Sequence, residues 1–341
     1  MTNWQNAKTR QRYCAGLILG LVVALSLGLI TGLTLTAEAK PNERTSGAKK
    51  PSQRITRTIV FPKNYSLGNV YVVPYKPEIM AVWTNAATST QKAQGTVPIR
   101  GDGLVMLTGS YQLAENMSVL KTLKPNDLQV LDMYRCEIED KDSSSIACLS
   151  GLIGLQLDDT EIGDSSLKTL SKLSNLVFLS LSSTQITGTT ISQLAPLKQL
   201  RRLELGRNLI KKENLVQLLQ LPQIERLGLQ GCRINDEDLD TICKLENLAA
   251  LLLLDNTQIT DLGLKKIASL KKLYYLEISH AQITPNGLKY LTKLPLKRLI
   301  LGKKQFTPSQ IERIKKMFPK AEIAIYDNSS RMDPELFTPL H

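Results

Sequence analysis

A pattern of aliphatic residues that returns every 24 positions limits the fold of this 341-residue chain more than any other feature. The segment Leu176–Ile186 reads L-x-x-L-x-L-x-x-T-x-I, and the same spacing begins again at Leu128, Leu152, Leu200, Ile224 and Leu248. A fixed period in the twenties is the signature of a solenoid, in which each unit packs only on its neighbours. The chain is therefore expected to be an array of short units.

Each repeat contains two halves with different periods. Alternating leucines such as Leu179 and Leu181 predict a short strand whose leucines point inward, and the spacing of Leu167, Leu170 and Leu173 predicts one face of a helix or 3₁₀ turn. Parallel strands joined by crossovers wind in a right-handed sense. The expected fold is an α/β, right-handed solenoid with parallel strands on its concave face and helices or 3₁₀ turns outside.

These residues resemble the leucine-rich repeat family over about residues 128–325, and Thr257–Leu264 matches a bacterial variant of the repeat. The segments Phe61–Lys63 and Ser66–Gly68, with Trp83, resemble the N-terminal module of exported bacterial proteins of this type. The resemblance implies a ladder of side chains that bond the turn backbone after each strand. Its members would be Cys136, Thr160, Thr184, Asn208, Cys232 and Thr257, followed by Ala281, which cannot donate.

The N-terminal 39 residues predict either a signal peptide or a membrane anchor. Positive charges precede an uncharged run from Tyr13 to Ala37, and a small-x-small cleavage site ends at Ala39. The run is also long enough to span a bilayer, and positive charges before it would keep the N-terminus in the cytoplasm. Both alternatives place the rest of the chain outside the cytoplasm, anchored by one helix or secreted after cleavage.

Composition predicts four further segments. Residues 40–55 are polar and basic, which predicts a flexible linker. Short β-branched runs between prolines and glycines in 56–110 predict a small β-rich module that caps the first repeat. Residues 111–326 would form the repeat domain with a C-terminal cap, and the polar stretch 327–341 a disordered tail.

The register is ambiguous at one repeat, because 25 residues separate Leu248 from Leu273. Counting back from Thr257 leaves Leu251 and Leu253 on the concave face, whereas counting forward from Leu248 places them in the core. A slip of one residue exchanges the two faces of a strand. We expect the register given by counting back from Thr257, because the ladder residue has to lie at the turn after the strand.

The concave face carries the strongest functional signal. Arginine and aromatic residues dominate affinity in protein interfaces, and they recur at one position of successive strands. We therefore expect a protein or peptide partner to bind there, on Phe178, Arg202, Arg226, Leu251, Tyr275 and Arg298.

Enzyme signatures are absent from the sequence, so we expect neither catalytic residues nor a cofactor. No nucleophile or carboxylate is placed by sequence beside His280, and the five cysteines show no metal-ligand spacing. Net charge is +12, and Lys265–Lys320 contains fourteen Lys or Arg against two acids. This positive charge suggests an alternative function. The chain could be a structural protein of the cell envelope whose basic C-terminal repeats bind anionic lipid or cell-wall polymer. Nucleic acid is not expected as a partner, since aromatic residues for base stacking are sparse.

Overall fold

The computed structural model describes residues 55–73 and 89–326. All described residues belong to one compact unit of the chain. The predicted signal or anchor, nearly all of the predicted linker, Trp83 and the predicted tail lie outside the described residues. Within the described ranges, no helix combines the length and apolar character needed to cross a membrane.

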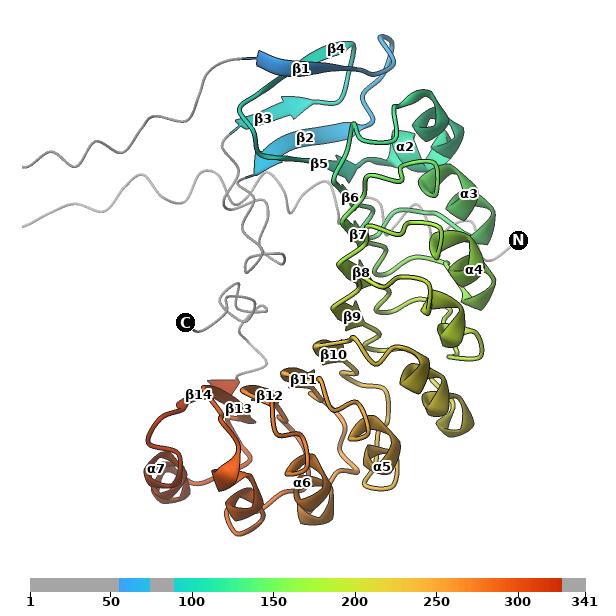
Figure 1. Cartoon of the computed structure of the whole chain (residues 1–341). Coiled ribbons are helices and arrows are strands. Elements are labelled where there is room, and N and C mark those ends of the chain that lie inside the picture. Colours follow the sequence, from blue (N-terminus) through green and yellow to red (C-terminus); the bar gives the residue numbers. More distant parts are fainter. Residues whose placement is uncertain (1–54, 74–88, 327–341) are drawn as a thin grey trace, which may run out of the picture. The chain divides into compact units, whose positions relative to one another are not determined.

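A sheet of twelve strands in the order β14 to β5, then β2 and β3, organises the described unit. From β5 (Leu104–Gly109) to β14 (Glu322–Tyr326) the strands are parallel and follow the sequence order. They line the inner side of a curve, and the helices lie outside (Figure 1). This arrangement confirms the predicted solenoid fold. The strands between are β6 Val130–Asp132, β7 Gly154–Gln156, β8 Phe178–Ser180, β9 Arg202–Glu204, β10 Arg226–Gly228, β11 Ala250–Leu252, β12 Tyr275–Glu277 and β13 Arg298–Gly302.

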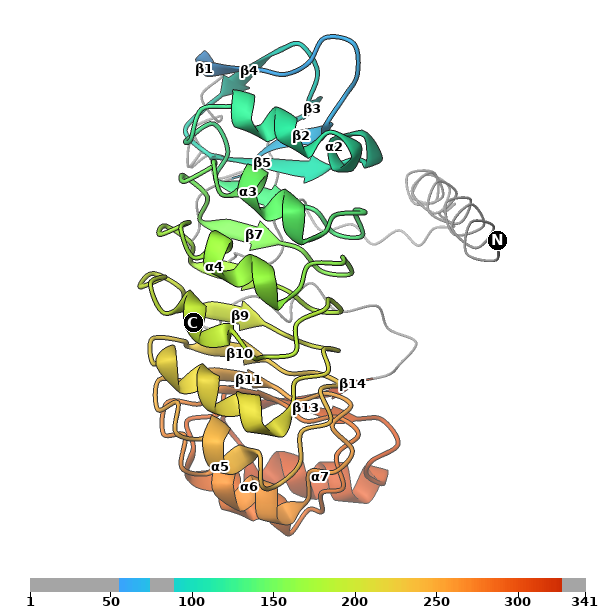
Figure 2. The same ribbon diagram turned by 90° about the vertical axis from the view of Figure 1, so that its right-hand side faces the viewer.

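The outer elements mix short α-helices with 3₁₀ helices, and they stack side by side along the outer face (Figure 2). Thr260 caps α6 by accepting the Leu262 N–H, and Thr307 forms a capping box with Gln310 at α7. The elements are α2 Tyr111–Glu115, η2 Met117–Thr122, η3 Asp140–Asp142, α3 Ser143–Ile146, η4 Asp164–Ser166, α4 Leu167–Leu170, η5 Ile191–Leu194, η6 Lys212–Gln220, α5 Leu239–Ile242, α6 Asp261–Ile267, η7 Gly287–Lys293 and α7 Pro308–Met317.

The core is one continuous aliphatic cluster between the strands and the outer helices. Leu179 of β8 and Leu181 just after it are fully buried in this cluster, as are Leu167, Leu170 and Leu173 of an outer segment. Burying one such side chain contributes roughly 1.5–3 kcal/mol. Because neighbouring repeats supply the burial, no repeat could hold this structure alone.

The N-terminal β-rich module is continuous with the solenoid sheet. Strand β1 (Ile55–Val60) pairs with β4 (Thr96–Arg100), and β2 (Gly68–Val73) pairs antiparallel with both β3 (Ser89–Lys92) and β5. Gly68 has φ +136°, and a Cβ there would lie 1.9 Å from the Thr108 carbonyl oxygen. Only glycine allows β2 to approach β5 so closely.

The register at β11 differs from the one we expected. Leu251 lies opposite Leu227 and Leu276, and both Leu251 and Leu253 are buried in the main core. The prediction that placed Leu251 on the concave face is therefore wrong. Ala250 and Leu252 take the concave positions, because the strand keeps the register of its neighbours and the extra residue is accommodated in the turn after it.

The ladder position in this repeat is also one residue earlier than predicted. Asn256 is fully buried, its Nδ2 donates to the Leu229 and Leu253 carbonyls at 2.8 and 3.0 Å, and its Oδ1 accepts the Ile234 N–H. Thr257 is exposed. Assigning Thr257 to the ladder was wrong, because the additional residue lies between Asn256 and Ile259.

The other ladder side chains bond the turns in two ways. The hydroxyls of Thr160 and Thr184 donate to carbonyls of their own repeat, Leu157 and Leu181, at 2.6 and 2.7 Å. Asn208 and Cys232 reach the preceding repeat, where they donate to the Leu181 and Leu205 carbonyls at 2.6 and 3.2 Å. Cys136 and Ala281 are buried at the same position in their repeats.

The residue just before each ladder position has a left-handed backbone. Its φ lies between 54° and 66° in every repeat, although only one of these residues is a glycine. Side-chain-bearing residues lose roughly 1–2 kcal/mol in this conformation. Backbone bonds to the next repeat stabilise it, as where the Ser183 N–H donates to the Gly206 carbonyl. The residues are Arg135, Asp159, Ser183, Arg207, Gly231, Asp255 and His280.

Candidate partner-binding wall

The concave-face side chains of β6 to β13 form two columns, which we call the wall. Paired residues of adjacent strands place each column in register. Five of the six predicted contact residues lie in the first column, and Leu251 lies in the core. The first column is Val130, Gly154, Phe178, Arg202, Arg226, Ala250, Tyr275 and Arg298; the second is Asp132, Gln156, Ser180, Glu204, Gly228, Leu252, Glu277 and Ile300.

Apolar clusters occupy both ends of the wall. The first cluster joins Val73, Met106, Val130 and Phe178, and the second joins Ala250, Leu252, Tyr275 and Ile300. The charged strands β9 and β10 lie between them. Two members of the second cluster, Ala250 and Leu252, belong to β11. The sequence would have indicated this cluster only if the register of β11 had been predicted correctly.

An ion pair and a stacked arginine form the centre of the wall. Arg226 Nε lies 2.8 Å from Glu204 Oε1, and each side chain is only 10% exposed. The Arg226 guanidinium also lies 5.5 Å from the centre of the Tyr275 ring, a cation–π distance. Ala250 stands between these two residues in the column, and its single methyl leaves room for the contact. Loss of Arg226 would leave the buried Glu204 carboxylate without this partner.

Burial changes the titration of the wall. Desolvation raises the pKa of Glu277 to about 7, with Arg226 opposing the shift and Glu204 adding to it. Burial and then the nearby charge of Arg226 lower the pKa of Arg202. Desolvation also raises the pKa of Tyr275, whose buried hydroxyl has no hydrogen-bond partner among the described residues. The charge of the wall therefore depends on pH near neutrality.

His280 has a partner that sequence reasoning missed. Its Nδ1 contacts Asp255 Oδ1, and its ring meets the Tyr326 ring edge-on at 6.1 Å. Asp255 and His280 occupy equivalent left-handed positions of successive repeats, so correct alignment of these repeats would have indicated the pair. The neighbouring Ser279 is fully buried.

The surroundings of the described cysteines and acidic residues indicate structural roles. Burial raises the pKa of the Cys136, Cys232 and Cys243 thiols to about 12, 11 and 12, which keeps them protonated near neutrality. All described cysteines are free thiols. In the described part of the chain, no group of His, Cys, Asp and Glu is arranged to hold a metal ion.

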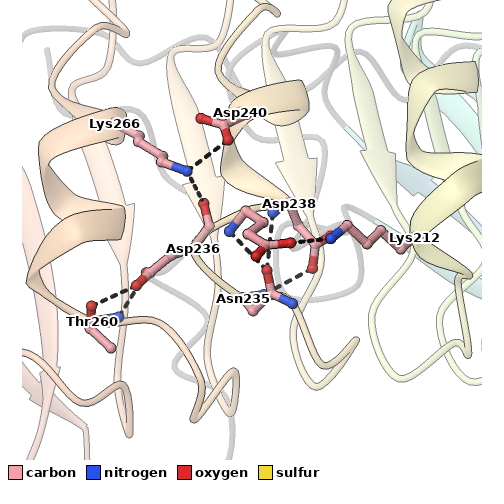
Figure 3. Close-up of polar contacts among 8 residues, drawn as sticks. Lys212, Asn235, Asp236, Asp238, Asp240, Thr260 and Lys266 are labelled. Atoms are coloured by element: carbon pink, nitrogen blue, oxygen red, sulfur yellow. Dashed lines mark hydrogen bonds and ion pairs between the residues drawn. The ribbon is translucent and has the colours of Figure 1, made fainter.

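Aspartates at the outer turns join neighbouring repeats. Asp236 accepts the Thr260 N–H at 2.9 Å and its hydroxyl at 2.6 Å (Figure 3). Lys266 in turn donates to the Asp236 carbonyl at 2.7 Å and pairs with Asp240 at 2.8 Å. Asp140, Asp164 and Asp261 make corresponding bonds in other repeats. These aspartates bond neighbouring repeats to one another, which indicates that their role is structural.

The basic residues of the C-terminal repeats lie mainly on exposed positions outside the wall. Lys265 is on α6, Lys289 and Lys293 are on η7, and Lys315 and Lys316 are on α7, all exposed. Lys315 pairs with Glu312 at 2.8 Å. Arg298 is the exception, because it is buried in the wall and lies 3.6 Å from Glu322.

No protein-family model and no curated protein matches the chain. Among solved structures it is similar to an internalin from Listeria monocytogenes at 21% identity, with a TM-score of 0.38, over 66% of this chain and 74% of the internalin. Internalin C2 from the same species matches at 25% identity and TM-score 0.41, over 57% and 80% of the two chains. A leucine-rich repeat protein from Leptospira interrogans matches at 25% identity and TM-score 0.38, over 60% and 62%. On its own geometry, the described part of this chain is a leucine-rich repeat solenoid.

Proposed function

We propose that this protein is a non-enzymatic scaffold outside the cytoplasm, which binds a protein or peptide through the wall. The observation that supports it best is the column of Phe178, Arg202, Arg226, Tyr275 and Arg298 on parallel strands in register. Extended concave surfaces of repeat arrays suit recognition of large partners. The placement outside the cytoplasm is supported by the sequence of residues 1–39 alone.

The composition of the wall defines the partner's chemistry. Apolar side chains would pack on the two clusters, and a carboxylate would meet Arg202, the partly exposed arginine between them. Planar guanidinium groups bind carboxylates in a bidentate manner, and an aromatic side chain beside them adds a rigid apolar surface. A partner segment with acidic residues between apolar ends therefore fits the wall.

Charge reversal at a partly exposed position of the wall tests this function. Arg202→Glu should reduce recovery of the partner at least about tenfold in crosslinking of intact cells followed by mass spectrometry, since a central charge pair contributes several kcal/mol. Arg202 is preferable to Arg226, whose removal would disturb the ion pair with Glu204.

Arg233→Glu is the matched control, because Arg233 is exposed on a turn outside the wall. It makes the same change of charge and should leave recovery unchanged. Equal recovery of the same proteins by the wild type and Arg202→Glu, with thermal unfolding preserved, would contradict binding through the wall.

A second candidate function is docking on anionic lipid or cell-wall polymer. The observation that favours it is the exposure of the lysines of α6, η7 and α7. Such binding should weaken steeply with salt, because exposed charges are screened over about 8 Å at physiological ionic strength. Retention on isolated cell envelopes should fall when salt is raised and when Lys265, Lys289 and Lys293 are changed to glutamine together. Retention that is indifferent to both changes would exclude it.

A further inference from the structure

The last strand of the sheet, β14, has one side open. It pairs in parallel register with β13 from Glu322 opposite Arg298 to Tyr326 opposite Gly302. It stands at the end of the strand order, so no other strand of the described residues pairs with its outer side. Such an edge presents backbone donors and acceptors to any chain that can align with it.

The backbone bonds show which groups face outward. The Glu322 N–H donates to the Lys297 carbonyl at 2.8 Å, and the Tyr326 carbonyl accepts the Lys303 N–H at 2.8 Å. Glu322 and Tyr326 therefore direct their backbone groups toward β13. Because successive residues of a strand alternate between its two neighbours, Ile323 and Ile325 direct their N–H and C=O groups to the open side.

Apart from Glu322 at its first position, the sequence of β14 contains none of the residues that usually protect an edge. It reads Glu-Ile-Ala-Ile-Tyr, with no proline, lysine or glycine. The strand at the other end of the same sheet, β3, reads Ser-Thr-Gln-Lys and ends in a lysine. The two ends of the sheet therefore differ in their capacity to accept a further strand.

Apolar side chains continue the surface around this edge. Ile325 is 36% exposed, and Ile311, Met317 and Ile323 are only partly buried against the end of the core. In the interior of the array, the equivalent side chains are covered by the next repeat. A chain added along β14 would cover these residues in the same way.

The charge around the edge is strongly positive. Lys303, Lys304, Lys315, Lys316 and Lys320 are exposed on the segments next to β14 in sequence or in the sheet. Among the described residues, Glu312 pairs with Lys315 and Glu322 lies 3.6 Å from Arg298. On the concave side of the edge, burial and then the charges of Glu277 and Asp255 raise the pKa of Tyr326. A second copy of this chain would bring two sets of lysines together, so charge favours an acidic partner.

We propose that the open edge of β14 binds an extended acidic segment of a partner protein by β-strand addition. The backbone of Ile323 and Ile325 would supply hydrogen bonds, and alternate side chains of the segment would contact the apolar residues and the lysines. This site lies at the end of the sheet and is separate from the wall.

Proline at an outward-facing position tests the proposal. Ile325→Pro removes an N–H that β13 does not use, a position where an edge strand tolerates proline. The matched control, Ile325→Val, keeps the N–H and the β-branched side chain. The probe is a fluorescein-labelled heptapeptide of alternating glutamate and valine, titrated by fluorescence anisotropy against the full chain.

We expect Ile325→Pro to weaken binding of this peptide at least about tenfold, and Ile325→Val to change it less than about twofold. A second variant leaves β14 intact: Lys315→Glu with Lys316→Glu should also weaken binding, more so at low salt. A peptide of alternating lysine and valine should not bind. Arg202→Glu should leave binding unchanged, which separates this site from the wall.

Hydrogen exchange gives a direct readout. The glutamate–valine peptide should slow exchange at the amides of Ile323 and Ile325 in the wild type. Unchanged binding by Ile325→Pro, with circular dichroism preserved, would overturn the proposal. So would binding that appears only after removal of residues 327–341, which would make this chain's own segment the occupant. A concentration-dependent dimer abolished by Ile325→Pro would equally overturn it in favour of a second copy.

Discussion

At the scale of single residues, the wall contains more charge than its burial would ordinarily permit. Glu204 is buried but paired with Arg226 at 2.8 Å. Glu277, in the same column, is buried, and desolvation raises its pKa to about 7. The folded protein therefore binds a proton at Glu277 more tightly than the unfolded chain does.

This shift predicts a pH-dependent effect of Glu277→Gln. A raised carboxyl pKa lowers the free energy of unfolding as pH rises from about 4.5 to about 7. The neutral amide escapes this loss. At pH 8 we expect the variant to be more stable than the wild type by about 1–3 kcal/mol, and at pH 4.5 nearly equal to it. Urea unfolding at both pH values measures the difference.

Glu312→Gln serves as the control for this measurement. Glu312 is exposed, and the hydrogen bond and charge of Lys315 lower its pKa. It should show no gain in stability at pH 8. A Glu277→Gln variant that is destabilised equally at both pH values would show that the carboxylate is well accommodated in its charged form.

At the scale of the repeat element, the extra residue near β11 shows which constraint governs register. We expected the ladder to coincide with Thr257, but the strand kept the alignment of its neighbours and Asn256 became the ladder residue. A shift of the strand by one residue would move every one of its side chains to the opposite face. An exposed turn accommodates one more residue at little cost in free energy. The sequence contained both possibilities, and only packing distinguished them.

Adjacent alanine substitutions test this assignment. Asn256→Ala should lower the free energy of unfolding by about 2–4 kcal/mol, because buried backbone groups at Leu229, Leu253 and Ile234 lose their partner. Thr257→Ala should change it by less than about 0.5 kcal/mol, since the side chain is exposed. Denaturant unfolding compares the two. A larger effect at Thr257 would restore the register that we first expected.

At the scale of the whole described unit, the repeats are not equally joined. Asp140, Asp164, Asp236 and Asp261 each accept a backbone N–H from the following repeat. The corresponding positions between them are occupied by Gly188 and Lys212. There, the Lys211 N–H donates to the Thr187 carbonyl, and the Asn235 N–H is bonded within its own turn by Asp238. The same region contains η6, a nine-residue 3₁₀ helix, and such long runs have poor hydrogen-bond geometry.

The middle of the array should therefore open before its ends do. In native-state hydrogen exchange, amides of η6 should exchange at least about tenfold faster than those of α6, which corresponds to the loss of one or two net hydrogen bonds. Lys212→Asp, which places a carboxylate at the position that corresponds to Asp164 and Asp236, should reduce the difference. Gln217→Asp is the control, because it adds the same residue elsewhere in η6. Uniform exchange along the solenoid would show that these aspartates do not set local stability.

The sequence by itself determined the repeat length, the strand-and-helix division of each repeat, and the leucines that form the core. These follow from local periodicity, which recurs with little change from unit to unit and is reinforced by its repetition. It also placed Phe178, Arg202, Arg226, Tyr275 and Arg298 in one column, because the recurring leucine pattern shows which residues become neighbours. Only the tertiary structure decided the register at β11, the Glu204–Arg226 pair, the Asp255–His280 contact and the open side of β14. Each of these depends on how one unit packs against the next. The spacing of residues along the chain does not show which side chains of neighbouring units come into contact.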